Sequence, residues 1–295
     1  MHRSDNGSVP EGDTVWLAAK RLHDALAGRE LTHTDFRVPS LATADLSGQT
    51  VLEVVSRGKH LLMRTDAGRT LHTHFRMDGT WHLYQPGARW AGGPDWQVRA
   101  VLGNADWIAV GYRLPVVELI ATAEEASAVG HLGPDLLGPD WDATRAVENL
   151  RAQPGCEIGP ALLDQRNLAG IGNLYKAETL FLSGITPWTA VGDIADLDGV
   201  VRRAHRLLHA NRDHWHQSTT GSLRRGEEHW VFERAGKPCR RCGSRINTAM
   251  QTEPEQPTYG RISYWCPACQ HGPAPEPMAA SDRRAAPSGY RRYVP

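Results

Sequence analysis

Cys239-Arg240-Arg241-Cys242 and Cys266-Pro267-Ala268-Cys269 repeat one short pattern, with 23 residues between them. Two such pairs bring four thiolates within reach of one ion, which suits a structural zinc site that is closed to substrate. Residues 245–248 and 262–265 have strand-like composition. The spacing therefore predicts a β-hairpin held by one zinc ion per chain. The alternative is a set of reduced cysteines without metal.

A glycine-rich stretch lies upstream of the cysteines, where residues 163–175 read Leu-Asp-Gln-Arg-Asn-Leu-Ala-Gly-Ile-Gly-Asn-Leu-Tyr. The glycines predict a tight turn, and Asn173 stands at the start of the helix that follows. Backbone amides in such a turn bind phosphate, aided by the helix dipole. The alternative is a helix–turn–helix in which the glycines serve packing alone. Apolar spacing predicts helices over residues 143–153, 158–163, 174–182, 194–211 and 223–231.

The first 120 residues have a different pattern. Residues 14–27 show helical spacing, with Asp13 as the expected N-cap and Gly28 as the stop. Short alternating runs separated by turn residues follow, at 51–55, 61–64, 70–73, 80–84, 98–102 and 107–110. These predict a β-sandwich or barrel of about six to eight strands. The fold class is therefore α+β, with a Gly/Pro-rich hinge over residues 131–140.

The stretch Val9-Pro10-Glu11-Gly12-Asp13 follows a polar leader of eight residues. Proline within a chain is a tertiary amide without reactivity, whereas at a chain start it is a secondary amine that forms a Schiff base with an aldehyde. A valine codon can serve as a start codon, and initiator methionine is commonly removed before proline. We therefore expect residues 1–9 to be a non-native leader.

Composition narrows the class of protein. Lys+Arg and Asp+Glu both number 33, so the net charge gives no global argument for nucleic acid. Residues 200–245 nevertheless hold eleven Lys or Arg against four Asp or Glu, which indicates either a solvated face or a polyanion site. No run approaches the roughly 20 apolar residues of a membrane span, and no signal peptide is evident. A cytoplasmic protein without membrane contact is expected.

Taken together, these motifs resemble the formamidopyrimidine-DNA glycosylase / endonuclease VIII family. Pro10-Glu11-Gly12 points to the endonuclease VIII branch, and the likeness spans residues 10–271. It implies an N-terminal helix with a β-sandwich, a helix–two-turn–helix domain and a zinc-bound hairpin. The expected boundaries are 1–9 for the leader, 10–122 for the catalytic domain, 123–142 for the hinge, 143–233 for the DNA-binding domain, 234–271 for the zinc finger and 272–295 for a disordered tail.

The resemblance also implies an activity and its residues. Family members excise oxidised bases and cut the strand, so damaged DNA is the expected partner of a monomeric bifunctional glycosylase and AP lyase. Pro10 would be the nucleophile that forms the Schiff base, and Glu11 the general acid. Lys59 matches the lysine of phosphate contact and β-elimination. Arg261 matches the zinc-hairpin arginine linked to δ-elimination.

Three further residues match DNA contacts of the family. Asn173 matches a phosphate-binding asparagine, Met77 the wedge that fills the gap left by a flipped base, and Arg76 a probe of the orphaned base. The alternative for Arg76 and Met77 is an ordinary hairpin tip. Thr14 and His131 depart from residues common in the family. If residues 1–9 remain attached, the chain would instead be an inactive DNA-binding protein.

Overall fold

The computed structural model describes residues 10–253, 256–278 and 291–292. The chain divides into two compact units. The first comprises the chain up to Leu132 together with Arg212–Trp215, and the second comprises Gly133–Asn211 and the chain from His216 onward. The division after Leu132 falls within the predicted hinge. The predicted leader, residues 1–9, lies outside the described residues.

The first unit is a sandwich of two antiparallel four-stranded sheets. One sheet has the order β1-β6-β7-β5, formed by His33–Phe36, Val98–Gly103, Ile108–Tyr112 and Thr80–Tyr84. The other has the order β2-β3-β4-β8, formed by Val51–Arg57, His60–Thr65, Arg69–His74 and Val116–Ala121. Alternate residues of both sheets meet in one core, whose members include Leu61, Met63, Leu71, Trp81 and Ala100.

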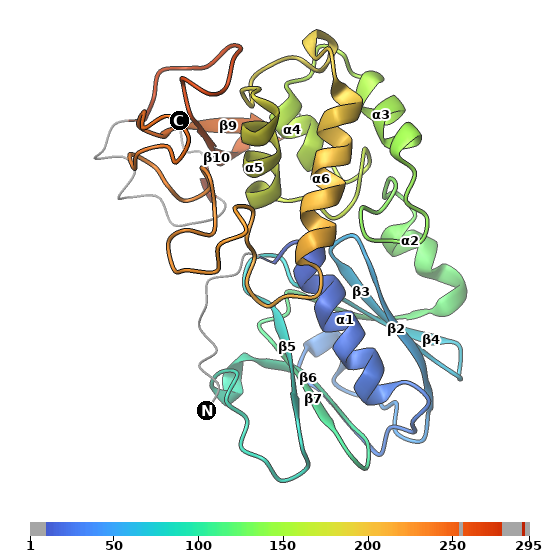
Figure 1. The fold of residues 1–295 in the computed structure, drawn as a ribbon. Helices are drawn as coiled ribbons and strands as arrows, with labels where there is room; N and C mark the ends of the chain where they lie inside the picture. Colours follow the sequence, from blue (N-terminus) through green and yellow to red (C-terminus); the bar gives the residue numbers. More distant parts are fainter. Residues whose placement is uncertain (1–9, 254–255, 279–290, 293–295) are drawn as a thin grey trace. The chain divides into compact units, whose positions relative to one another are not determined.

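Helix α1 (Gly12–Leu26) packs against β2 and β3 (Figure 1). Its apolar positions recur at helical spacing, so Val15, Leu22 and Leu26 are all buried in the sandwich core. The prediction that Asp13 caps this helix was wrong. Glu11 occupies the N-cap position without a side-chain cap bond, and Asp13 lies in the first turn.

Short helical segments complete the first unit. They are the 3-10 turns Pro39–Leu41, Asp95–Gln97 and Thr122–Glu124, and the five-residue helix α2 (Glu125–Val129). Glu125 ties this last segment to the second sheet, because it accepts hydrogen bonds from Arg64 and Thr70. Helix α2 therefore begins beside the sheet face that points away from the core.

The second unit is helical and ends in a β-hairpin. Its helices are α3 (Ala143–Arg151), α4 (Ile158–Leu163), α5 (Asn173–Ser183) and α6 (Leu197–Asn211), with a 3-10 turn at Val191–Asp193. Strands β9 (Asn247–Glu253) and β10 (Gln256–Trp265) pair antiparallel, and β11 (Arg291–Arg292) pairs with β10. Figure 1 shows α5 beside this hairpin. The predicted α+β class and the predicted strands and hairpin are confirmed.

One predicted helix is absent. Residues 223–231 form turns instead, and Gly226 adopts a φ of 82°. The amides of Trp230, Val231 and Phe232 each donate to the buried carboxylate of Glu178 at 2.8 Å. Because these amides converge on one side chain, they are not available to a helical ladder.

Two further observations concern the C-terminal tail and the helices. Most of the predicted disordered tail lies outside the described residues; within it, the amide of Met278 donates to the carbonyl of Thr248 at 2.7 Å. Among the described helices, none combines the length and the apolar character that a membrane crossing requires.

Candidate functional site

Pro10 and Glu11 stand directly before α1. Pro10 is half-buried, and Glu11 is only 1% exposed. The Glu11 carbonyl accepts the amide of Val15 at 3.1 Å, which starts the helical ladder. The start of an α-helix carries a partial positive charge from the aligned peptide dipoles. This end of α1 therefore favours a carboxylate at Glu11 and disfavours a positive charge at position 10.

Lys59 lies in the two-residue turn between β2 and β3. The register pairs Arg57 with His60, so Gly58 and Lys59 form the turn. Gly58 has a φ of 58°, a left-handed conformation that glycine adopts without steric cost. Lys59 is half-buried. Helix α1 packs against the same β2-β3 hairpin that carries Lys59. Lys59 and the Pro10-Glu11 pair before α1 therefore belong to one packed substructure.

Arg76 and Met77 lie in the connection between β4 and β5. Met77 is 37% exposed, and Arg76 adopts a φ of 46°. The Arg76 amide donates to Nδ1 of His74 at 2.9 Å, which fixes this unusual backbone. A Cβ atom at Gly79 would approach the Phe75 carbonyl oxygen to 2.7 Å, so the loop requires glycine there. An apolar tip is thus held outward on a constrained loop.

The glycine-rich stretch ends where α5 begins. Gly172 is the N-cap and Asn173 the first helical residue. The Asn173 Nδ2 group donates to the carbonyl of Ile262 at 3.0 Å, which places Asn173 next to the backbone of β10, one residue from Arg261. Gln165 braces the turn, since it donates to the carbonyls of Leu163 and Ile171 and accepts the Gly170 amide.

Two buried residues of α5 escaped the sequence analysis. Lys176 is fully buried and donates to Ser263 Oγ at 2.7 Å, which adds a second link between α5 and β10. Glu178 is fully buried and accepts hydrogen bonds from Thr219 as well as from the three amides of 230–232. Lys176 carried one signal, as one of four lysines in an arginine-rich chain. Glu178 carried none.

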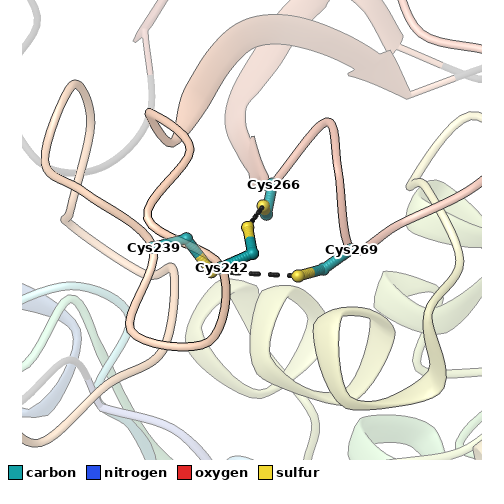
Figure 2. Close-up of side chains that lie close together, drawn as sticks. All are labelled: Cys239, Cys242, Cys266 and Cys269. Carbon is teal, nitrogen blue, oxygen red and sulfur yellow. Dashed lines mark hydrogen bonds between the residues drawn. The ribbon is translucent and has the colours of Figure 1, made fainter.

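The four cysteines converge as their spacing predicted (Figure 2). Their sulfur atoms all lie within 4.8 Å of one another. The Cys242–Cys266 distance is 3.4 Å and the Cys239–Cys269 distance is 4.0 Å. Sulfurs around one tetrahedral ion at a metal–sulfur distance of ~2.3 Å would be roughly 3.8 Å apart. The donor set therefore fits a metal ion.

The environment of these thiols is uneven. A hydrogen bond from Ser244 lowers the pKa of Cys242 to about 6. Burial raises the pKa of Cys266 and of Cys269. The amide of Arg241 points at Cys239 Sγ at 3.4 Å, a contact that stabilises sulfur when it carries negative charge. Four thiols this close lose their protons together most readily when a cation balances them.

The predicted residues fall into two groups. Pro10, Glu11, Lys59, Arg76 and Met77 belong to the first unit. Asn173, Arg261 and the four cysteines belong to the second, where Arg261 is half-buried on β10 and pairs with Gln251 in the sheet register.

The protein thus has two parts. A β-sandwich with an N-terminal helix is followed by a helical unit with a four-cysteine hairpin, and this combination defines a class of multi-domain protein. Family models place the chain within it. The formamidopyrimidine-DNA glycosylase N-terminal domain matches residues 9–110, and the H2TH domain of the same glycosylase matches residues 132–210. The chain belongs to the formamidopyrimidine-DNA glycosylase / endonuclease VIII family, as its motifs predicted.

Named relatives agree along nearly the whole chain. The "Probable endonuclease 8 2" of Streptomyces coelicolor is 58% identical over 272 residues, which cover 91% of this chain and 96% of the relative. The "DNA-(apurinic or apyrimidinic site) lyase Nei2" of Mycolicibacterium smegmatis is 44% identical, with 89% and 99% covered. The Fpg of Lactococcus lactis, solved with DNA containing an abasic site, shares the fold with a TM-score of 0.74 at 23% identity, covering 89% of this chain and 100% of that one.

Proposed function

We propose that this protein is a bifunctional DNA glycosylase and AP lyase of base excision repair, which excises oxidised bases, chiefly pyrimidines. The observation that carries this proposal is the near-full-length likeness to relatives named endonuclease 8 and AP lyase, at 44% to 58% identity. Damaged DNA is the corresponding substrate. A monomeric state and a cytoplasmic location remain predictions.

Pro10 is the proposed nucleophile. Its secondary amine attacks C1′ of the damaged nucleotide and loses its proton as the bond to the base breaks. The C1′–O4′ bond then opens, with a proton transferred to O4′, and the nitrogen and C1′ form an iminium ion. The iminium accepts the electrons released when C2′ loses a proton, so the 3′ phosphate leaves by β-elimination and the 5′ phosphate by δ-elimination. The partial positive charge at the start of α1 disfavours a protonated amine and thereby keeps Pro10 nucleophilic.

This chemistry requires a chain that begins at Pro10. With residues 1–9 attached, the Pro10 nitrogen is an amide without a lone pair available for attack. The family match that starts at residue 9 supports a start at Val9, with removal of that first residue. If the leader is retained, the alternative function is DNA binding without catalysis.

Further residues of each unit have proposed roles. Glu11, buried at the helix start, moves protons during sugar opening. Lys59 contacts phosphate and assists β-elimination. Arg261 and Asn173 bind phosphate, and the link from Asn173 to the neighbouring Ile262 carbonyl supports their joint action. Exposed Met77 is the wedge that replaces a flipped base, with Arg76 beside it.

The four cysteines are proposed to hold one structural zinc ion. Four thiolates leave no open coordination position, so the ion would supply folding free energy to the hairpin that carries Arg261 rather than chemistry. The proposed domains keep the predicted boundaries, with the catalytic sandwich over residues 10–122, the helical DNA-binding domain over 143–233 and the zinc finger over 234–271.

Borohydride trapping on abasic-site DNA tests the proposal. Borohydride reduces an iminium to a stable amine, so a chain that starts at Pro10 should become covalently linked to the DNA. The chain that retains residues 1–9 is the matched control and should give no adduct at Pro10, and Pro10→Gly should give less. No adduct from the chain that starts at Pro10 would refute the enzymatic function.

A further inference from the structure

A row of polar side chains lies on the outer face of the β2-β3-β4-β8 sheet. The register places His60 opposite His74 on β4, and His72 opposite Glu118 on β8. Alternate residues of a strand point to opposite faces. The core takes the other set, Leu61, Met63, Leu71 and Val117. The histidines and Glu118 therefore share the face that points away from the core.

Two hydrogen bonds join His60, His72 and Glu118 in series, and these three side chains are called the relay below. His60 Nδ1 and His72 Nε2 are 2.8 Å apart, and His72 Nδ1 and Glu118 Oε2 are 3.0 Å apart. The His72 side chain is 5% exposed, whereas that of Glu118 is 57% exposed. Glu118, at one end of the relay, thus meets solvent. The other end is His60, the neighbour of Lys59 in sequence.

The carboxylate determines where each proton lies. An ionised carboxylate only accepts hydrogen bonds, so Nδ1 of His72 must donate to Glu118. A neutral imidazole carries one proton, which makes Nε2 of His72 the acceptor and Nδ1 of His60 the donor. The Nε2 atom of His60 then carries a lone pair. Among the described residues, no hydrogen bond engages this atom.

The surroundings keep the His60 and His74 rings neutral, because they lower the pKa of both. Burial lowers the pKa of His60 to about 3, assisted by the nearby charges of His74, His72, His131 and Lys59. Burial also lowers the pKa of His74 to about 4, with Lys59, His72 and Arg76 contributing. The His74 and His131 rings meet the His60 ring edge-on, with centroids 4.6 Å and 6.3 Å away. Glu125 is the other carboxylate near His72, and it is bound to Arg64 and Thr70.

We propose that Glu118 and His72 are positioning residues that act through His60. They hold His60 as the neutral tautomer protonated on Nδ1, so that its Nε2 is a fixed hydrogen-bond acceptor beside Lys59. A lysine ammonium has three donors on a flexible stem and takes its direction from nearby acceptors. The relay thereby orients Lys59 for the elimination step, a role that rests on the proposed function.

Glu118→Ala is the most informative variant. Glu118 is exposed and β8 is an edge strand, so the fold should survive its truncation. Without the carboxylate, His72 is free to adopt either tautomer, and His60 follows it. Glu124→Ala removes an exposed glutamate of the same unit that has no part in the relay, and serves as control. His72→Phe deletes both hydrogen bonds and provides a second test.

Each variant would be made in the chain that starts at Pro10 and measured in three ways. Imidazole ¹⁵N shifts report the tautomers, borohydride trapping reports Schiff-base formation, and single-turnover kinetics on abasic-site DNA report β-elimination over about pH 6 to 8. We expect wild-type His60 and His72 to be protonated on Nδ1. Glu118→Ala and His72→Phe should disturb the His60 tautomer, slow β-elimination about tenfold and change its pH profile. Trapping should not fall, and Glu124→Ala should match wild type.

The outcomes separate the two proposals. If wild type traps DNA but Glu118→Ala and His72→Phe keep the wild-type elimination rate and pH profile, the relay has no role. Wild-type rings protonated on Nε2 would refute the relay by themselves. A wild-type chain that traps no DNA would refute the proposed function, and with it the role of His60, whatever the tautomers.

Discussion

The four cysteines of the second unit and the four histidines of the first are clusters of the same size with different construction. The sulfurs of the cysteines all lie within 4.8 Å of one another. The histidines meet as a stacked pair, His60 and His72, with His74 and His131 edge-on to His60. Among the described residues, the cysteines form the one set of three or more ligand-type side chains with donor atoms that close together.

The difference lies in what balances each cluster. Thiolates repel one another and need a cation, so the cysteine cluster is suited to a metal ion. Imidazoles both donate and accept, so His60 and His72 hydrogen-bond to each other, and Glu118 bonds to the other nitrogen of His72. One cluster is built to hold a cation, and the other to hold protons at fixed positions.

Removal of one thiolate should give the largest effect. Cys266→Ser leaves three ligands at a site whose zinc affinity corresponds to roughly 10–16 kcal/mol in isolated zinc fingers. We expect zinc content well below one ion per chain and weakened DNA binding, as measured by metal analysis and by titration with abasic-site DNA. Cys156→Ser, outside the cluster, should change neither. A full zinc complement in Cys266→Ser would contradict the assignment.

The carboxyl group of Glu178 is buried, and backbone amides rather than a cation contact it. Its loss leaves the amides of Trp230, Val231 and Phe232 without their acceptor. Glu178→Ala should therefore lower the free energy of unfolding by about 3 kcal/mol, measured by urea denaturation. Glu148→Ala, an exposed residue of α3, should stay within about 0.5 kcal/mol of wild type. Equal effects would show that Glu178 contributes no special stability.

The histidine cluster predicts sensitivity to acid. The folded pKa of His60, about 3, and that of His74, about 4, lie below the ordinary histidine pKa of 6.5. As the pH falls below 6.5, the unfolded state binds protons first, so the stabilising contribution is complete above that pH and is lost toward pH 3. His60→Phe should make the loss of stability between about pH 7 and 4.5 smaller by about 2 kcal/mol.

The control for this acid effect is His214→Phe, a substitution at an exposed histidine. It should leave the pH dependence of the unfolding free energy as in wild type. If His60→Phe also leaves it unchanged, His60 is not held neutral by the fold, and the contrast with the cysteines fails.

The smallest expected effect concerns the turn that carries Lys59. Gly58 has a φ of 58°, so Gly58→Ala should cost about 1 kcal/mol of folding free energy and slow β-elimination by displacing Lys59. Gly155→Ala places a methyl group in open space at a position without positive φ and is the matched control. Urea denaturation and single-turnover kinetics provide the readouts.

The cysteine cluster could be predicted from the sequence, whereas the histidine cluster could not. Each cysteine pair meets through a turn of a few residues, so the spacing alone predicts the cluster. Six of the eight sandwich strands were predicted from local alternation, whereas β1 and β8 were not. The histidine cluster depends on the register that sets His60 against His74 and His72 against Glu118. No local sequence pattern determines which residues of neighbouring strands lie opposite each other, so the sequence did not predict this cluster.

The same reasoning explains the predicted helix that was wrong. Residues 223–231 have helical spacing, but the amides of Trp230 and Val231 at the end of this stretch donate to Glu178, which lies more than fifty residues earlier in the chain. Tertiary contacts of this kind override local propensity. Asp13 is not the cap because the helix begins at Gly12, two residues before the expected first helical residue, Thr14.

The most direct test of the account is to map the residue that bonds to DNA. The chain that starts at Pro10 would be trapped with borohydride on abasic-site DNA, digested and analysed by mass spectrometry. We expect a single adduct on the nitrogen of Pro10. An adduct on Lys59 or on another lysine, with Pro10 unmodified, would contradict it.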